Sequence, residues 1–139
     1  MNRLNYNIYT TIAPSTAVRL LKSSGTPSVY NKLTVAPGVW IITAMFNPFC
    51  ISGTPNSSRI KMFVSNVNSA TVWTAFQASS CHQMLNGQYD SADSARMVNT
   101  FVIDLSASST DLYLWGVIDY SGGTSWGYDY AEVKATRIA

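Results

Sequence analysis

Hydrophobic and polar residues alternate with a period of two in short runs along the chain, and a helical period is nearly absent. The runs are rich in Val, Ile, Thr, Tyr and Trp, and clusters of Gly, Pro, Ser and Asn separate them, as is typical of strands joined by turns. Such runs predict an all-β fold, an antiparallel β-sandwich or jelly roll of about eight strands. The strands are expected near residues 16–22, 29–36, 39–47, 59–66, 71–78, 96–105, 111–120 and 125–138.

The segments between these runs predict turns and loops. Pro37 and Gly38 favour a tight turn, which is expected to join the strands on either side of it as a hairpin. Residues 121–124, Ser-Gly-Gly-Thr, predict a second hairpin in the same way. Residues 47–58 and 79–95 show no clean period and are expected to be long loops, which often carry function.

Two of the predicted strands are apolar on both faces, namely those at 39–46 and 111–120. A two-layer sandwich covers only one face of each sheet, so the second apolar face predicts a covering subunit, or an N-terminal segment folded across it. The residues expected at an interface between subunits are Trp40, Phe46, Tyr113 and Trp115.

Aromatic residues gather in the last predicted hairpin and supply the candidates for a binding site. An exposed ring can stack on the apolar face of a sugar while its hydroxyl or indole N–H donates a hydrogen bond. Trp126 and Tyr128 flank the turn at 121–124 and are expected to reach the surface, although the same rings could instead be core or subunit contacts. The candidate ligand-binding residues are Trp126, Tyr128, Tyr120, His82 and Tyr89.

The residue inventory argues against an enzyme. His82 is the only histidine, and its neighbour Cys81 points to the opposite side of an extended chain, so the two do not form a nucleophile–base pair. No two carboxylates are placed around a cleft, and no glycine-rich phosphate loop precedes a helix. Asp90 and Asp93 could offer oxygen ligands to calcium, but without the dense spacing of a calcium loop. No metal and no cofactor is expected.

Composition limits the partners. The 139 residues predict one domain, 1–139, in which residues 1–15 form an N-terminal arm or connecting segment. The net charge of +2 comes from scattered basic residues, so nucleic acid is not an expected partner. No apolar stretch is long enough for membrane insertion, and no secretory signal is visible at the N-terminus. Folding in a reducing cytoplasm is therefore expected, with Cys50 and Cys81 as free thiols.

Three segments resemble the β-sandwich domain found in tailed-bacteriophage virion proteins, often at the tips of tail fibres. Residues 33–40 are similar to its strand–turn–strand with a Gly followed by a Trp. Residues 105–114 are similar to its small-residue turn leading into a strand with a tyrosine, and residues 120–124 with 133–139 to its closing strand. The chain departs from the family in its aromatic last hairpin and in residues 47–58. The resemblance implies a homotrimer in the virion, with no catalytic residues.

Several functions are compatible with this sequence. The resemblance favours a tail-fibre or receptor-binding tip that attaches to a host-cell surface glycan or protein and contacts other virion proteins. The alternative is a capsid decoration or tail-assembly protein with no receptor-binding role. A non-viral trimeric jelly roll, of the complement or cytokine type, and a glycan hydrolase are the remaining hypotheses.

Overall fold

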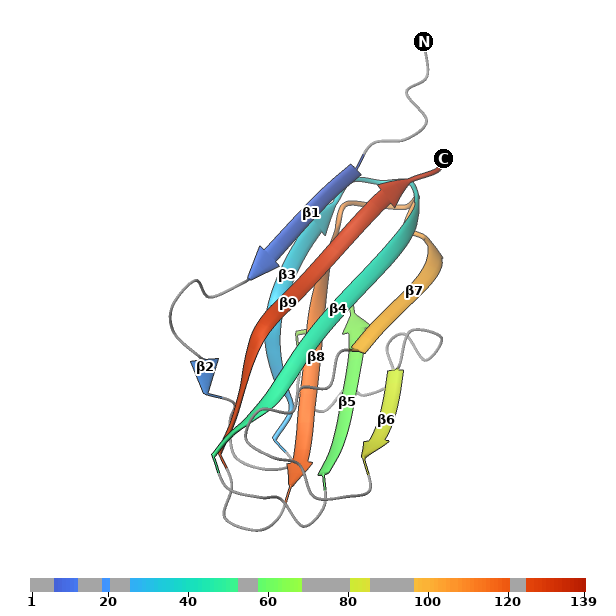
Figure 1. The fold of residues 1–139 in the computed structure, drawn as a ribbon. Helices are drawn as coiled ribbons and strands as arrows, with labels where there is room; N and C mark the ends of the chain where they lie inside the picture. Colours follow the sequence, from blue (N-terminus) through green and yellow to red (C-terminus); the bar gives the residue numbers. More distant parts are fainter. Residues whose placement is uncertain are drawn as a thin grey trace.

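The computed structural model describes residues 7–12, 19–20, 26–52, 58–68, 81–85, 97–120 and 125–139. Side chains are described for residues 26–52, 60–68, 97–119, 126–128 and 130–139. Every regular element in these residues is a strand, as Figure 1 shows. The strands are β1 (Asn7–Ile12), β2 (Arg19–Leu20), β3 (Ser28–Val35), β4 (Val39–Ser52), β5 (Ser58–Ser65), β6 (Cys81–Leu85), β7 (Met97–Asp104), β8 (Thr110–Tyr120) and β9 (Ser125–Arg137).

The strands form two sheets that pack face to face (Figure 1). Sheet 1 has the order β1-β9-β4-β7, with β2 also paired to β9, and sheet 2 has the order β3-β8-β5-β6. Every pairing is antiparallel. Because β1 and β2 share one edge position beside β9, the described strands fill eight positions, and the prediction of an all-β jelly roll of about eight strands is confirmed.

The two turns expected to make hairpins instead carry the chain from one sheet to the other. The turn at Pro37 and Gly38 joins β3 of sheet 2 to β4 of sheet 1, and residues 121–124 join β8 of sheet 2 to β9 of sheet 1. The hairpin predictions are therefore wrong, although the turn at Pro37 and Gly38 lies where the sequence places it. Turn residues determine a local reversal of the chain, whereas sheet membership depends on which face each strand must bury.

The core lies between the sheets and follows the two-residue period of the strands. In β4 the even-numbered residues from Trp40 to Cys50 are buried, and the odd-numbered residues are partly exposed. The register places Ile42 opposite Ala135 of β9 and Phe101 of β7, so the inward side chains form rows across sheet 1. Inward residues of sheet 2 that meet these rows include Leu33, Ile60, Met62, Val64, Leu112, Leu114 and Ile118.

An aromatic group and a buried amide connect the two sheets. The ring of Tyr30 on β3 lies 4.8 Å from those of Phe46 and Tyr128 on sheet 1. The amide Nδ2 of Asn31 donates a hydrogen bond of 2.9 Å to the backbone carbonyl of Ala131 on β9. Gly116 makes room for the rings, because a Cβ there would lie 2.8 Å from Phe46 and 2.9 Å from Tyr30. Glycine at this position is thus required by space.

Both segments expected to be long loops contain strand. Residues 47–52 continue β4, and a register shift at Pro48 leaves the alternation of buried and exposed residues intact. Residues 81–85 form β6, which pairs with β5. The Asn-Pro pair at 47–48 favoured a loop in the first segment, and the lack of a clear period at 79–95 favoured a loop in the second, so neither strand was predicted. The strand predicted at 71–78 lies outside the described residues.

The N-terminal arm expected at residues 1–15 also contains a strand. β1 pairs with β9 from Asn7 opposite Thr136 to Ile12 opposite Ala131, so this segment is an edge strand of sheet 1. Backbone hydrogen bonds to β9 hold it in place, and they leave little trace in the sequence. Within the predicted strand at 16–22, only Arg19 and Leu20 are described as strand.

Candidate interaction surfaces

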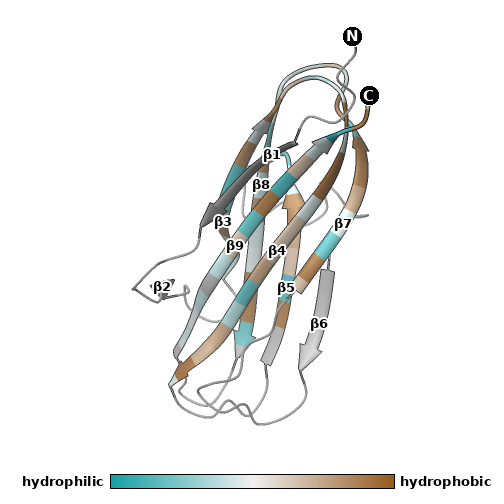
Figure 2. Ribbon diagram, turned by 45° about the horizontal axis from the view of Figure 1, so that its top comes forward, coloured by the Kyte–Doolittle hydropathy of each residue, from teal (hydrophilic) through white to brown (hydrophobic). Residues whose placement is uncertain are grey.

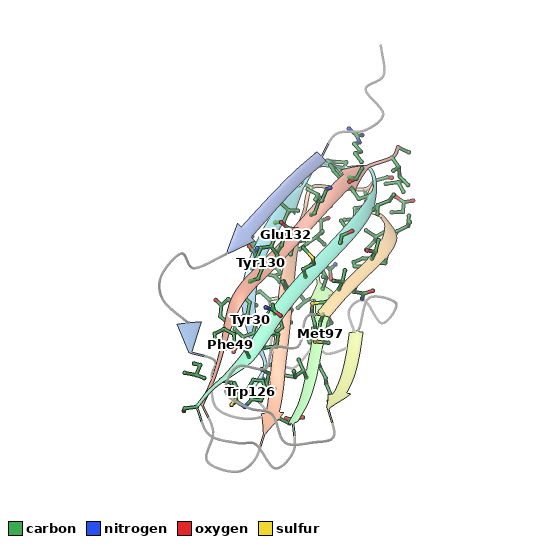
Figure 3. The ribbon with its side chains drawn as sticks, viewed as in Figure 1. Tyr30, Phe49, Met97, Trp126, Tyr130 and Glu132 are labelled. Atoms are coloured by element: carbon green, nitrogen blue, oxygen red, sulfur yellow. The ribbon has the colours of Figure 1, made fainter. Side chains whose placement is uncertain are left out.

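The structure buries the two aromatic residues that were expected to reach the surface. Trp126 is 2% exposed and Tyr128 is 4% exposed, and both belong to the core between the sheets. Trp126 is labelled in Figure 3. The cause is a bulge in β9: Tyr130 lies opposite Asn47 and Tyr128 opposite Pro48, so Asp129 is one extra residue. The bulge reverses which residues face inward, and the prediction that Trp126 and Tyr128 are exposed is wrong.

Three other ligand-binding candidates have no described side chain. Tyr120 ends β8 opposite Ser58, and His82 lies in β6 opposite Lys61. Tyr89 lies outside the described residues, as do Asp90 and Asp93. A binding role for these residues stays a prediction.

The residues expected at a subunit interface divide into three groups. Trp40 and Phe46 are each 1% exposed and lie in the core, so they are not available to a second subunit. Trp115 points to the outer side of sheet 2 but is also buried within this chain, where its ring stacks on Phe63 with 6.0 Å between centroids. Tyr113 is half-buried on the same outer side. Of the four candidates, only Tyr113 keeps an accessible surface.

Tyr113 belongs to a polar cluster on the outer side of sheet 2. The Lys32 ammonium lies 2.7 Å from the Asp111 carboxylate and 5.6 Å from the centre of the Tyr113 ring. Thr34 Oγ1 donates a 2.6 Å hydrogen bond to the same carboxylate, and the Tyr113 hydroxyl donates another of 3.2 Å. These hydrogen bonds, that of Lys32 first, hold the pKa of Asp111 below its ordinary value, and the bond to Asp111 raises the pKa of Lys32. The cluster is polar, exposed and internally paired.

The outer side of sheet 1 has a polar half and an apolar half. On β9, Glu132 accepts a 2.8 Å hydrogen bond from the Tyr130 hydroxyl, and both residues are labelled in Figure 3. On β4 and β7 the side chains on this outer side are mainly apolar: Ile41 and Met45 are half-buried, Val98 is 50% exposed and Val102 is 62% exposed. Figure 2 shows the contrast, with more hydrophilic bands on β9 than on β4.

Sequence reasoning singled out the β4 part of this apolar half, in the run at 39–46 that is apolar on both faces, but not the β7 part. The signal was present in residues 97–104, where Val98, Thr100 and Val102 alternate with Met97, Phe101 and Ile103, so both faces of the strand are largely uncharged. Alternation alone does not tell which of two apolar faces a sandwich will bury.

The described residues show little that would support other chemistry. No three His, Cys, Asp or Glu residues among them come together to hold a metal ion. The buried Cys50 is a thiol and not part of a disulfide, as expected, and its Sγ donates a hydrogen bond of 3.4 Å to the backbone carbonyl of Ser52. The side chain of Cys81 is not described. Burial raises the pKa of Tyr30 to about 12, but this phenol lies among core rings. Within the described ranges, no helix is long and apolar enough to cross a membrane.

Solved structures similar to this chain include viral particle proteins. One is VP2 of infectious bursal disease virus in a subviral particle, with a TM-score of 0.57, 13% identity, and coverage of 95% of this chain and 33% of that one. Another is from the T13 particle of the same virus, with a TM-score of 0.56, 12% identity, and coverage of 94% and 31%. A third, from derived T=1 particles, has a TM-score of 0.56, 12% identity, and coverage of 94% and 32%.

This likeness establishes the fold and its extent. The chain spans about a third of the length of the viral chains it matches, and nearly all of its own length takes part. No family model matches the sequence, and no curated protein matches it. The chain is thus a jelly roll of the kind found within a viral particle protein.

Proposed function

We propose that this chain is a structural subunit of a virion, made in the host cytoplasm and assembled with copies of itself and with other virion proteins. The observation that carries the proposal is the match of 95% of the chain to VP2 in a subviral particle. The apolar half of the outer face of sheet 1 supports it, because a subunit of an assembly needs surfaces that are buried against neighbours.

We propose a homotrimer as the assembly unit, following the resemblance of residues 33–40, 105–114 and 120–124 with 133–139 to the tailed-phage virion domain. Its contacts cannot involve Trp40, Phe46 or Trp115, which this chain buries by itself. The outer face around Ile41 and Met45 remains available. Sedimentation equilibrium tests this directly: a trimer has three times the 15.2 kDa of the chain, and a monomer at all attainable concentrations would refute self-assembly.

Host attachment at a bacteriophage tail-fibre tip is the second candidate function. The cluster of Lys32, Thr34, Asp111 and Tyr113 favours it, because it combines an aromatic ring with exposed hydrogen-bonding groups, as sugar recognition requires. His82, Tyr89 and Tyr120 stay predicted members of a receptor site. The alternative remains a capsid decoration or tail-assembly protein with no receptor.

A binding assay separates these two candidates. Fluorescently labelled protein is titrated onto a panel of bacterial cells and purified surface polysaccharides, and a receptor-binding tip is expected to bind one of them saturably. Tyr113→Ala is expected to weaken that binding about tenfold, whereas Val67→Ala, at an exposed position outside the cluster, leaves it unchanged. If no panel member binds saturably, the purely structural alternative holds.

A catalytic role is not part of the proposal. The sequence offers one histidine and no placed carboxylate pair, and the resemblance to the phage domain implies no catalytic residue. Incubation with the same polysaccharides is expected to release no reducing ends, and their release would contradict this expectation.

A further inference from the structure

The edge of β7 that faces away from β4 has features of a pairing surface. Among the described strands, β7 is the last in sheet 1, with β4 on one side (Figure 1). Natural sheets commonly protect such edges with Lys, Pro or a bulge. The edge strand β3 of sheet 2 has both Lys32 and a bulge between Val29 and Asn31. β7 has no Lys, Arg or Pro, its register with β4 is unbroken, and its one charge, Asp104, lies at its end.

The hydrogen-bond pattern shows which residues of β7 face the open edge. Gly38 and Leu105 exchange both backbone bonds, at 3.3 and 2.8 Å, so they form a hydrogen-bonded pair of the antiparallel ladder. Hydrogen-bonded and non-hydrogen-bonded pairs alternate along such a ladder. The pairs that include Val98, Thr100 and Val102 are therefore non-hydrogen-bonded, and the backbone N–H and C=O groups of these residues point away from β4. The same three residues have exposed side chains on the outer face.

We propose that β7 pairs with β7 of a second copy of this chain, antiparallel and around a two-fold axis at Thr100. In this register Thr100 lies opposite the same residue of the second copy, and Val98 lies opposite Val102. Each of these three pairs exchanges two backbone hydrogen bonds. Sheet 1 thereby continues across the two copies without an open edge at β7.

Two features of the sequence favour this register. On the outer face an apolar row then crosses from one copy to the other. It consists of Ile41 and Val102 of one copy followed by Val98 and Met45 of the second copy, and the two-fold axis generates a second, identical row. Between these rows lies a row of threonines, in which Thr43 and Thr100 already share a hydrogen bond of 3.1 Å.

Other two-fold registers fit less well. An axis at Val102 places Asp104 opposite Thr100 and shortens the overlap of the two strands. An axis at Val98 places Val102 opposite position 94, outside the strand. An axis at Phe101 overlaps the strands as fully as one at Thr100, but it places Thr100 opposite Val102 and Val98 opposite Asp104. The axis at Thr100 combines this overlap with a match of apolar to apolar and hydroxyl to hydroxyl positions.

The proposal deepens the proposed virion role and rests on it. A trimer supplies one kind of contact between copies, and a two-fold contact through β7 supplies a second, as a closed particle requires. Edge pairing widens the apolar outer face of sheet 1 rather than covering it, so the outer face remains available for contacts within a trimer.

Cysteine cross-linking tests the pairing and its register. Hydrogen-bonded antiparallel pairs have Cα atoms about 5.5 Å apart, within the range that a disulfide spans. Under mild oxidation, T100C is expected to give a covalent dimer of twice 15.2 kDa on non-reducing gels. The single variants V98C and V102C are expected not to form this dimer. In each of them the two cysteines of the paired copies are four positions apart along the strands, about 13 Å. The V98C/V102C double variant restores the cross-link. Parent protein and V67C, at an exposed position outside β7, are the controls.

Two outcomes overturn the pairing. One is T100C that cross-links no faster than V67C, and the other is V98C or V102C that cross-links as fast as T100C. A second measurement does not depend on cysteine chemistry: V102K is expected to raise the dissociation constant of the two-fold contact at least about tenfold, and V67K to leave it unchanged. Sedimentation equilibrium measures trimer formation separately. The experiments can therefore refute the two-fold contact without refuting the trimer, and can refute the trimer without refuting the two-fold contact.

Discussion

The outer faces of the two sheets begin from the same sequence pattern and differ in the folded chain. β8 in sheet 2 and β4 in sheet 1 are each apolar on both faces. On β8 the outward Trp115 and Val117 are 4% and 2% exposed, so a single chain buries them. Beside β4, the outward Val98 and Val102 of β7 stay 50% and 62% exposed. Two-sided apolarity therefore predicts burial on both sides, but the covering group can be the chain itself or a second copy.

The largest expected effect tests the buried outer face of sheet 2. Trp115→Ala is expected to lower the free energy of unfolding by about 3–5 kcal/mol, because it removes a large buried ring and leaves a cavity beside Phe63. Urea unfolding followed by far-ultraviolet circular dichroism measures the loss.

Trp115→Phe is the matched control. It keeps an aromatic ring and removes an indole N–H that has no hydrogen-bond partner among the described residues, so the loss is expected to be much smaller. If Trp115→Ala lowers the free energy of unfolding by less than about 1 kcal/mol, the outer face of sheet 2 is as open as that of β7. The difference between the outer faces of the two sheets would then be refuted.

A smaller effect is expected on the inner side of the same strand. Gly116→Ala is expected to lower the free energy of unfolding by about 1–3 kcal/mol, because the new methyl group would lie 2.8 Å from Phe46 and must displace it or Tyr30. The measurement is the urea midpoint. Repeating it in Tyr30→Leu, which reduces the crowding, is expected to recover part of the loss, and full additivity would contradict the steric explanation.

A still smaller effect is expected at the exposed cluster of sheet 2. The pKa of Asp111 in the folded chain lies below its ordinary value of 3.8, so its stabilising contribution is present above that pH and is lost as pH falls below it. Asp111→Asn is expected to reduce the stability difference between neutral and acid pH slightly, because the ion pair is exposed. Urea midpoints at both pH values measure this difference, and an unchanged difference would contradict the prediction.

The smallest effect on stability is expected at the open face of sheet 1. Val102→Ala is expected to change the free energy of unfolding by less than about 0.5 kcal/mol, since the side chain is already 62% exposed. The measurement is made at a concentration where the chain is monomeric. A loss above 1 kcal/mol under those conditions would show that this chain buries Val102 itself, and the two faces would then be alike.

Short-range patterns predicted much of the fold. Period-two runs located strands at β3, β4, β5, β7, β8 and β9, and Pro37-Gly38 and residues 121–124 located reversals of the chain. Gly38 illustrates the limit of such reasoning: a Cβ there would lie 2.7 Å from the Arg137 side chain and 2.8 Å from the Ala139 carbonyl. The glycine is needed where the chain end returns to the turn, a contact between residues about a hundred positions apart.

The candidate site was harder to predict because one inserted residue reverses the faces of a strand. Trp126 and Tyr128 share an even-numbered phase with Tyr130, and a regular strand would keep all three on one side. The extra residue Asp129 sends Trp126 and Tyr128 into the core and leaves Tyr130 on the outside, beside Glu132. A bulge of this kind depends on pairing with β4, so it could not be foreseen from β9 alone.

The sequence by itself determined that this chain is built of antiparallel strands, where most of them begin and end, and which of them are apolar on both faces. These properties depend on neighbouring residues, through side-chain alternation and turn chemistry. Only the tertiary structure decided which sheet each strand joins, which aromatic rings are buried, and that β7 is the last described strand of sheet 1, with Val98 and Val102 exposed. These properties depend on contacts between distant segments, where register and burial are decided together.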